Sequence, residues 1–224
     1  MKNTTNKLLT ALFGVMVFIL IITVSISLPI YLRFFYYLQI EPLEITYYYD
    51  YSVIKTAYNQ MLNYLTLPGG TFKTGELPHT AEFASHMKDV KGLFMLNFWG
   101  LIISLATVIT LLVLNKKKKI ELRRPFNMSA SFISAVSIFV VIAVIGSLVA
   151  VDFDKAFTIF HKIMFPGKSN WLVYPKDDPA ILILPSEFFL NCAILIGASV
   201  VIISLSVIVF NLIKRHKYAK KHKN

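Results

Sequence analysis

Two histidines are the residues of this sequence best suited to chemistry at neutral pH. His86 lies in the segment 85–91, Ser-His-Met-Lys-Asp-Val-Lys, and His161 lies in the segment 160–165, Phe-His-Lys-Ile-Met-Phe. An imidazole titrates near pH ~6.5, so it can both accept and donate a proton under physiological conditions. Each histidine also lies close to a long apolar run of the chain. The sequence therefore predicts acid–base chemistry at a boundary between lipid and water.

The elements that must position these histidines are four apolar runs of membrane-spanning length. The chain has 224 residues, of which 56% are hydrophobic, and its mean hydropathy is +0.62. A helix needs about 20 apolar residues to cross the roughly 30 Å of hydrocarbon in a bilayer. The four runs are 8–32, 93–114, 129–151 and 189–213. Because the first run is longer than the apolar part of a typical signal peptide, we favour an uncleaved anchor over a cleaved signal.

Basic charge is concentrated in three of the five segments outside these runs. The three segments hold 14 of the 23 basic residues and one acidic residue, which leaves a balance of +13. The other two segments have a balance of −2. Membrane proteins keep lysine and arginine on the cytoplasmic side, so both termini and the basic loop are predicted to be cytoplasmic and both histidines extracellular. The basic segments are 1–7, 115–128 and 214–224, and the outer segments are 33–92 and 152–188.

The topology already accounts for the net charge of +11. We therefore do not expect the lysine run at 116–119 to bind nucleic acid. Attraction of the basic segments to anionic lipid headgroups is a natural secondary role. Cys192 is the only cysteine and lies within the fourth run, so no intramolecular disulfide can form.

The pattern predicts an all-α membrane protein, a bundle of four transmembrane helices with two extracellular domains made mainly of helices and loops. In the first extracellular domain we expect a helix that Asp50 caps and that ends before Pro68, and a second helix that runs from near Thr80 into the second span. In the second domain, Asp152 or Asp154 is expected to cap a short helix. The tyrosines and phenylalanines between 34 and 51 are typical of an interfacial belt.

Carboxylates flank His86 on its predicted helix. Glu82, His86 and Asp89 follow the i, i+4 and i+7 spacing of one helix face, so either carboxylate could orient the imidazole. His86, Asp89 and His161 could supply three metal ligands if the two domains meet. However, no metal-ligand motif, G-x-S-x-G elbow or glycine-rich phosphate loop is present. We therefore expect neither metal nor cofactor, and a substrate that carries its own nucleophile.

At these residues the chain resembles a known family, the bacterial lipoprotein intramolecular transacylases called Lit. The resemblance covers the whole architecture, and its most specific parts are short motifs. These are the segment 82–91 with His86-Met87-Lys88-Asp89-Val90-Lys91, then Phe160-His161, Trp171 and Pro185-Ser186-Glu187-Phe188-Phe189. The pairs Tyr58-Asn59 and Tyr64-Leu65 are similar but less specific.

This resemblance implies a reaction and a place for it. The substrate would be a diacylated lipoprotein, whose sn-2 ester acyl chain moves to the α-amine of its N-terminal cysteine and leaves a lyso-form lipoprotein. His86 and His161 would be catalytic, with His86 as the base, Glu82 or Asp89 orienting it, and His161 stabilising the oxyanion or protonating the leaving oxygen. The two histidine roles could be exchanged.

The resemblance further implies Tyr58, Trp171 and Glu187 as substrate-binding candidates. It also implies no cofactor, and a multi-pass protein of the bacterial cytoplasmic membrane with its site on the outer side. Two alternatives remain open at this point. One is a non-catalytic membrane subunit that binds lipid or a partner protein, and the other is an acyltransferase or esterase that acts on another lipid. The oligomeric state is left undetermined.

Overall fold

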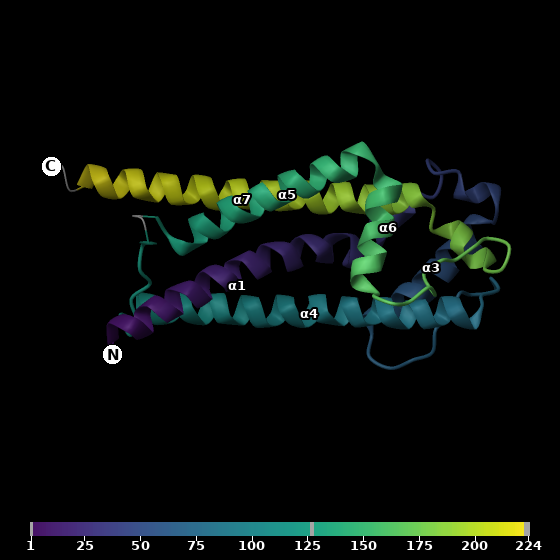
Figure 1. Ribbon diagram of the computed structural model, residues 1–224, viewed down its shortest axis with the longest axis horizontal. Helices are drawn as coiled ribbons and strands as arrows, with labels where there is room; N and C mark the ends of the chain where they lie inside the picture. Colours follow the sequence, from purple (N-terminus) through teal and green to yellow (C-terminus); the bar gives the residue numbers. More distant parts are fainter. Residues whose placement is uncertain (1, 126–127, 222–224) are drawn as a thin grey trace. The chain divides into compact units, whose positions relative to one another are not determined.

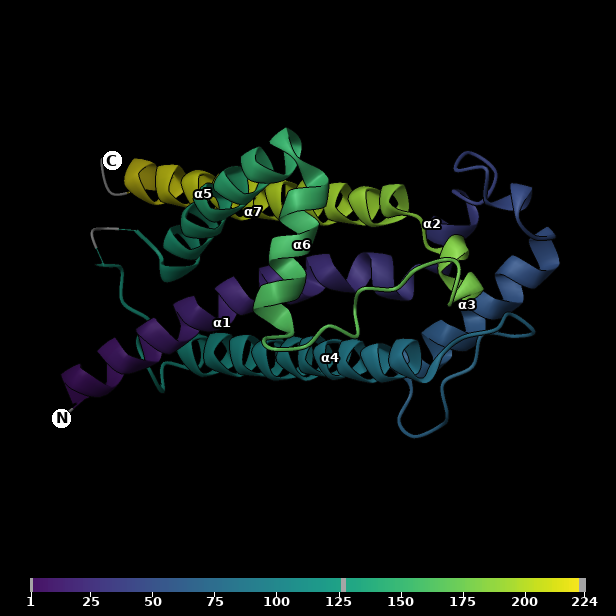
Figure 2. The ribbon, with the colours of Figure 1, turned by 45° about the vertical axis from the view of Figure 1, so that its right-hand side comes forward.

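The computed structural model describes residues 2–125 and 128–221, and within these ranges the regular elements are helices (Figures 1 and 2). In chain order they are α1 (Lys2–Tyr31), α2 (Arg33–Tyr37), the 3-10 helix η1 (Ile45–Tyr47), α3 (Tyr51–Thr66), α4 (Ala81–Lys116), α5 (Ala130–Val151), α6 (Phe153–Met164), the 3-10 helix η3 (Pro179–Ile183) and α7 (Ser186–Lys221). Side chains are described for residues 3–125 and 128–216, so the basic tail that was predicted at 214–224 lies partly outside the described residues.

Four helices, α1, α4, α5 and α7, are long and apolar enough to cross a membrane. The second outer helix and the second span are one continuous helix, α4, as the sequence predicted. Its 36 residues span about 54 Å, far more than the hydrocarbon requires. Because residues 81–92 carry Glu82, Lys88, Asp89 and Lys91, these first turns belong outside the membrane-spanning stretch at 93–114.

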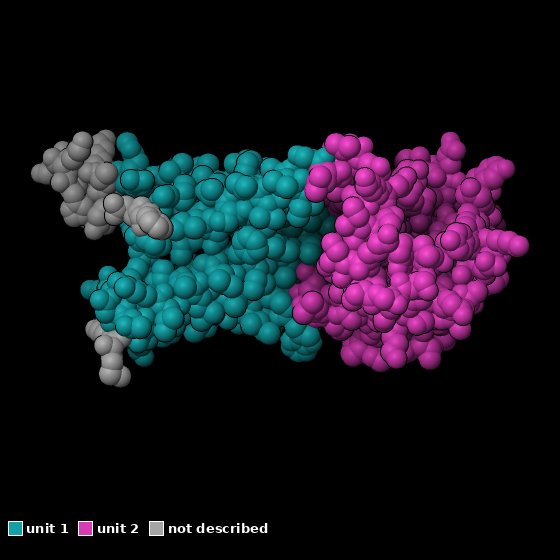
Figure 3. Space-filling view, viewed as in Figure 1, with its two compact units in different colours: residues 1–26, 98–147, 196–224 teal, residues 27–97, 148–195 magenta. Residues whose placement is uncertain are grey.

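The chain divides into two compact units, which Figure 3 shows in different colours. Unit 1 comprises residues 1–26, 98–147 and 196–224, and it contains much of the apolar length of the four long helices. Its interior includes Phe13, Ile21 and Ala135, while many other apolar side chains, such as Ile202 and Phe210, face outward. Outward apolar side chains suit a helix bundle whose solvent is lipid.

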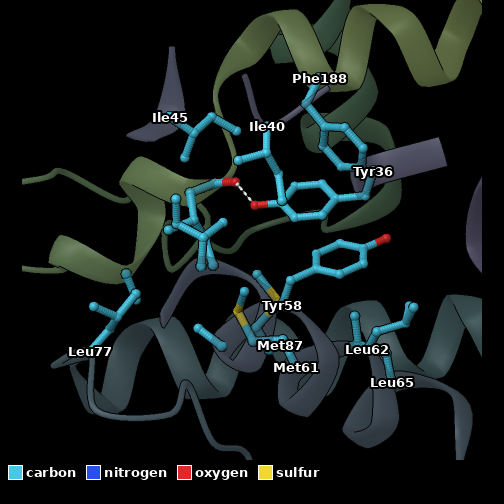
Figure 4. Close-up of a cluster of buried hydrophobic side chains, with 14 of the residues drawn as sticks. Tyr36, Ile40, Ile45, Tyr58, Met61, Leu62, Leu65, Leu77, Met87 and Phe188 are labelled. Carbon is cyan, nitrogen blue, oxygen red and sulfur yellow. Dashed lines mark hydrogen bonds between the residues drawn. The ribbon is translucent and has the colours of Figure 1, made fainter. Parts of the chain in front are cut away.

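Unit 2 comprises residues 27–97 and 148–195, and it has an aromatic core (Figure 4). Tyr36 of α2 stacks on Tyr58 of α3 with ring centroids 3.7 Å apart, and the ring of Phe188 from α7 meets Tyr36 edge-on at 5.1 Å. The Tyr36 hydroxyl donates a hydrogen bond of 2.7 Å to the Ile183 carbonyl in η3. The tyrosines and phenylalanines between residues 34 and 51 are therefore only partly an interfacial belt, because Tyr36 is fully buried whereas Tyr47 is 84% exposed.

The helix ends in unit 2 agree only in part with the predicted caps. The Asp152 carboxylate accepts a hydrogen bond of 2.9 Å from the Lys155 N–H and caps α6, as expected. Asp50 occupies the cap position of α3 but makes no cap hydrogen bond with its side chain. Ser186 is the first residue of α7 and donates its hydroxyl to the Glu187 carboxylate at 3.2 Å.

The start of α4 is held by a residue from the other outer segment. Asp178 is 4% exposed, and its carboxylate accepts hydrogen bonds from both the backbone N–H and the hydroxyl of Thr80. The Thr80 hydroxyl in turn accepts a hydrogen bond of 3.2 Å from the N–H of Phe83, in the first turn of α4. A buried carboxylate therefore fixes the helix that carries His86.

Candidate active site

The fold of unit 2 brings the two candidate histidines together. His86 lies on α4 and His161 lies on α6, and their ring centroids are 5.7 Å apart with the rings tilted by 36°. Both side chains are buried, at 6% and 7% exposure. Figures 1 and 2 show that α6 runs transverse to α4 rather than along it, with its last turn next to α4. One face of each helix can therefore contribute to a shared site.

A single hydrogen bond fixes the tautomer of His161. Its Nδ1 lies 2.8 Å from the carbonyl oxygen of Phe157, one turn earlier in α6. A carbonyl oxygen only accepts, so Nδ1 carries the proton and the lone pair of the neutral ring lies on Nε2. Burial lowers the pKa of His161 below its usual range, and the hydrogen bond to the Phe157 carbonyl opposes this shift.

Aromatic rings surround His161. Phe157 lies 4.2 Å from its ring, Trp171 lies 5.1 Å away, and Phe165 lies 5.8 Å away, all measured between ring centroids. The Phe157 ring also contacts Phe189 of α7 at 5.4 Å. This apolar surrounding favours an uncharged imidazole.

His86 has a different setting, in the first turns of α4 and outside the span at 93–114. Its Nδ1 is buried and has no hydrogen-bond partner, and its ring meets the edge of Phe165 at 5.0 Å. Burial is the main cause that lowers the pKa of His86 to about 4; the neighbouring His161 and Lys168 act in the same direction, and Asp89 acts in the opposite direction. His86 is therefore neutral at physiological pH.

Among the described residues, neither of the two carboxylates that were expected to orient His86 is hydrogen-bonded to its ring. Asp89 accepts a hydrogen bond of 2.5 Å from the Lys168 ammonium and one of 3.1 Å from the Asn170 amide. Glu82 is exposed. Asn170 also donates to the Ser85 hydroxyl at 3.3 Å, so the loop after α6 is tied to α4 at two points. Asp89 lies on α4 at the predicted spacing from His86. Its carboxylate, however, is held by the Lys168 ammonium, because a charged donor forms a stronger hydrogen bond than a neutral imidazole does.

The three substrate-binding candidates lie in three different environments. Trp171 lies beside His161, with its indole N–H donating to the Lys168 carbonyl at 2.9 Å. Tyr58 is only 5% exposed within the stack on Tyr36, so its ring packs the core. Glu187 is exposed in the first turn of α7, where a carboxylate suits the helix dipole.

Among the residues that the structure describes, no three His, Cys, Asp or Glu side chains converge on a point where a metal could bind. The trio His86, Asp89 and His161, which was weighed as a ligand set, is divided because Asp89 is occupied by Lys168 and Asn170.

Several residues of the site were not singled out from the sequence. Lys168 and Asn170 hold Asp89, Phe157 and Phe165 line the histidine rings, and Asp178 caps α4. The sequence marks 166–179 as a turn-rich stretch, and nothing in its local pattern shows which side chains turn back toward α4. Phe157 lies four residues, about one helical turn, before His161. This spacing can be read from the sequence, but it indicates only that the two side chains share a helix face.

Four membrane-spanning helices, with a buried histidine pair in a second helical unit, define a membrane-integral protein with a candidate acid–base site. A family model for the lipoprotein intramolecular transacylase Lit matches residues 11–189. The chain belongs to this family and is an acyltransferase, which confirms the resemblance inferred from the motifs. A search against curated proteins finds no match.

Solved structures show the same fold. The structure of the membrane-integral lipoprotein intramolecular transacylase Lit from Bacillus cereus is 21% identical to this chain, and the match covers 99% of this chain and all of the other at a TM-score of 0.85. Two further structures of that protein, in which a histidine is replaced by arginine or by alanine, match 96% of this chain at a TM-score of 0.75 and 21% identity. The predicted all-α membrane fold is thereby confirmed.

Proposed function

We propose that this acyltransferase moves the sn-2 acyl chain of a diacylglyceryl-modified lipoprotein to the α-amine of the same molecule. The observation that carries the proposal is the buried pair of neutral imidazoles, 5.7 Å apart, contributed by two different outer segments. Such a pair moves protons without supplying a covalent nucleophile. It therefore suits a substrate in which amine and ester are already joined.

His161 is the better candidate for the general base. Its hydrogen bond to the Phe157 carbonyl orients the ring and leaves Nε2 as the proton acceptor. The α-amine has a pKa near ~8, so a base must remove its proton as it attacks the ester carbonyl. This is the exchanged assignment that the sequence left open beside His86 as the base.

His86 then acts on the oxygen atoms of the ester rather than on the amine. A neutral imidazole can donate a hydrogen bond from its N–H to a developing oxyanion, and it does so best in a site that excludes water. His86 is neutral and buried, and no carboxylate is hydrogen-bonded to its ring among the described residues. His86 is thus placed to stabilise the tetrahedral intermediate or to protonate the departing glyceryl oxygen.

The step balances within the substrate. A C–N amide bond forms between the amine and the acyl carbon, and the C–O ester bond to the sn-2 oxygen breaks. The one proton that the amine loses is accepted by His161 and is then passed, directly or through His86, to the departing glyceryl oxygen, so that both imidazoles return to their neutral forms. No cofactor or external acyl donor is consumed. Holding amine and ester in contact lowers the barrier by up to about 7–11 kcal/mol in ideal intramolecular cases.

The acyl chains of the substrate would lie along α6. This amphipathic helix exposes Ile159, Phe160, Ile163 and Met164, with exposed fractions of 48%, 48%, 64% and 40%. Exposed apolar side chains beside a buried histidine suit a helix at the lipid surface. The charge balance of the sequence supports an extracellular position for this surface.

The test is an assay of purified protein with a synthetic diacylated lipopeptide, read by mass spectrometry. We expect formation of the N-acyl, S-monoacylglyceryl product, and a loss of at least about 100-fold in rate in His161→Gln and in His86→Ala. The matched control is His79→Gln, because His79 lies in the same unit but is exposed and is hydrogen-bonded to Thr74.

The chemistry of the acceptor is tested separately. A lipopeptide whose α-amine is acetylated should not react. If it still loses its sn-2 chain, the protein is an esterase and the proposal fails. Normal product formation by both histidine variants would remove the pair from the mechanism.

A further inference from the structure

Unit 1 contains a small pocket whose walls combine cations with apolar side chains. It has a volume of about 80 Å³ and lies where the segment before α5 meets the end of α7. Its lining residues are Arg124, Met128, Ser129, Phe132, Asn211, Leu212, Lys214 and Arg215. This volume exceeds that of one water molecule, about 30 Å³ in the liquid, and suits a group of the size of a phosphate.

Hydrogen bonds between the two helices hold the pocket in shape. The Ser129 hydroxyl donates to the Asn211 side-chain oxygen, and the Asn211 amide donates to the Val207 carbonyl at 2.8 Å and to the Ser131 hydroxyl at 3.3 Å. Ser129 also accepts a hydrogen bond of 3.1 Å from the Phe132 N–H. Lys214 and Arg215 therefore lie on a helix that is hydrogen-bonded to the start of α5 through Asn211.

The charge of unit 1 favours an anionic ligand. Residues 1–26, 98–147 and 196–224 contain 14 basic residues and a single acidic one, Glu121. The described lining of the pocket contains no carboxylate that could neutralise Lys214 and Arg215. A phosphate placed among Arg124, Lys214 and Arg215 would do so, because guanidinium groups bind phosphate oxygens in pairs.

The apolar side of the pocket favours a phospholipid as the source of that phosphate. Met128, Phe132 and Leu212 line it beside the cations, and a free phosphate ion gains nothing from them. A glycerophospholipid places its phosphate next to a glycerol and acyl chains, which matches cations beside apolar walls. The pocket also lies at the ends of two membrane-spanning helices, where headgroups are found.

We propose that this pocket is a binding site for the phosphate of an anionic phospholipid, separate from the histidine site. Removing two of its three cations should weaken lipid binding, by about fivefold for each charge lost, or roughly 25-fold in total. Zwitterionic phosphatidylcholine has the same phosphate but no net charge, so it should bind more weakly than phosphatidylglycerol.

The experiment measures lipid bound to the full-length protein by native mass spectrometry after titration with phosphatidylglycerol, phosphatidylcholine or inorganic phosphate. The pocket variant is Lys214→Gln with Arg215→Gln. The matched control is Lys117→Gln with Lys119→Gln, which removes the same charge from unit 1 but does not touch the pocket. Both variants should keep the acyl-transfer activity of the parent, which shows that each is folded.

We expect the parent and the control to retain phosphatidylglycerol equally and the pocket variant to lose it. Equal retention by both double variants would overturn the proposal, since the charge would then act without the pocket. Inorganic phosphate that binds as tightly as phosphatidylglycerol, with the same sensitivity to the pocket variant, would overturn the lipid assignment. Equal binding of phosphatidylcholine and phosphatidylglycerol would overturn the role of charge.

Discussion

The hydrogen bond from His161 to the Phe157 carbonyl separates the two histidines of the site chemically. It gives His161 one defined tautomer, whereas the buried Nδ1 of His86 has no partner. In the proposed mechanism, two imidazoles in one apolar site thus have different tasks because of one backbone carbonyl. The sequence contains the same four-residue spacing between Phe157 and His161, but spacing alone does not show where a ring nitrogen points.

Both histidines should resist protonation. Burial lowers the pKa of each, and that of His86 lies at about 4. In ¹⁵N-histidine NMR spectra of the detergent-solubilised protein, the imidazole of His86 should therefore remain neutral at pH 5.5, where a free imidazole is mostly charged, and that of His161 should titrate at a lower pH than a free imidazole. His86→Asn and His161→Asn spectra assign the two signals. A midpoint near pH 6.5 for both would contradict the burial seen in the structure.

The same shifts give stability a defined pH dependence. The folded protein takes up these protons at lower pH than the unfolded chain does, so acid favours unfolding. Thermal stability should be constant above about pH 6.5 and should decrease as the pH falls toward 4. The His86→Asn variant should lose less stability than the parent between pH 7 and pH 5, by about 1 kcal/mol or more. Identical slopes would argue that other groups dominate.

At the scale of elements, the first and second outer segments hold each other in place. Asp178 next to η3 caps α4, and Lys168 in the loop after α6 pairs with Asp89 on α4. Each contact links a turn-rich loop to the helix that bears His86. The geometry of the site therefore depends on loops that contain neither histidine.

Loss of the Asp178 cap should affect both stability and activity. Asp178→Ala leaves the Thr80 N–H and hydroxyl without their acceptor, which should cost about 1–2 kcal/mol and displace the first turns of α4. We expect a lower midpoint of thermal unfolding and a lower rate in the lipopeptide assay. Asp178→Asn keeps one acceptor oxygen and should lie between the parent and Asp178→Ala. The exposed neighbour Asp177 is the control, and an equal effect of Asp177→Ala would mean that the cap is unimportant.

The role of Asp89 can be decided by a double-mutant cycle. If Asp89 acts by tying Lys168 to α4, then Asp89→Asn and Lys168→Met should slow acyl transfer to a similar extent, and the double variant should be no slower than either. Stability should change by less than about 1 kcal/mol, because the Lys168 side chain is half-exposed. If Asp89 instead orients His86 directly, Asp89→Asn should be far slower than Lys168→Met. Rates of the four proteins distinguish the two roles.

At the scale of the whole molecule, the membrane topology determines on which side of the bilayer the candidate site lies. The basic segments 1–7, 115–128 and 214–224 predict cytoplasmic termini, and both histidine segments follow on the outer side. This orientation agrees with the need of a lipoprotein acyltransferase to meet its substrate at a membrane surface.

Labelling of single cysteines tests the orientation. In a Cys192→Ala background, Tyr47→Cys should react with a membrane-impermeant maleimide on intact cells, because Tyr47 is 84% exposed in unit 2. Lys119→Cys, in the basic loop, should react only after the cells are lysed. The opposite pattern would place the histidines in the cytoplasm and would rule out the proposed outer-leaflet reaction.

The sequence by itself determined the helical class and the presence of four helices long and apolar enough to span a membrane, and it singled out the two candidate histidines. Hydrophobic length and the distribution of basic residues are local properties of the sequence, and they govern which segments insert into a bilayer. Apolar runs such as 93–114 can therefore be recognised without tertiary information. The continuous helix α4 and the Asp152 cap followed from local pattern for the same reason.

Only the tertiary structure decided that His86 and His161 meet, that Lys168 holds Asp89, and that Tyr58 packs on Tyr36. These contacts join segments far apart in the chain, and turn-rich loops such as 166–179 carry no periodicity from which their path can be read. Burial and the partner of each imidazole nitrogen depend on those paths. The residues capable of acid–base chemistry were therefore visible in the sequence, whereas their roles follow from the environment that the fold builds around them.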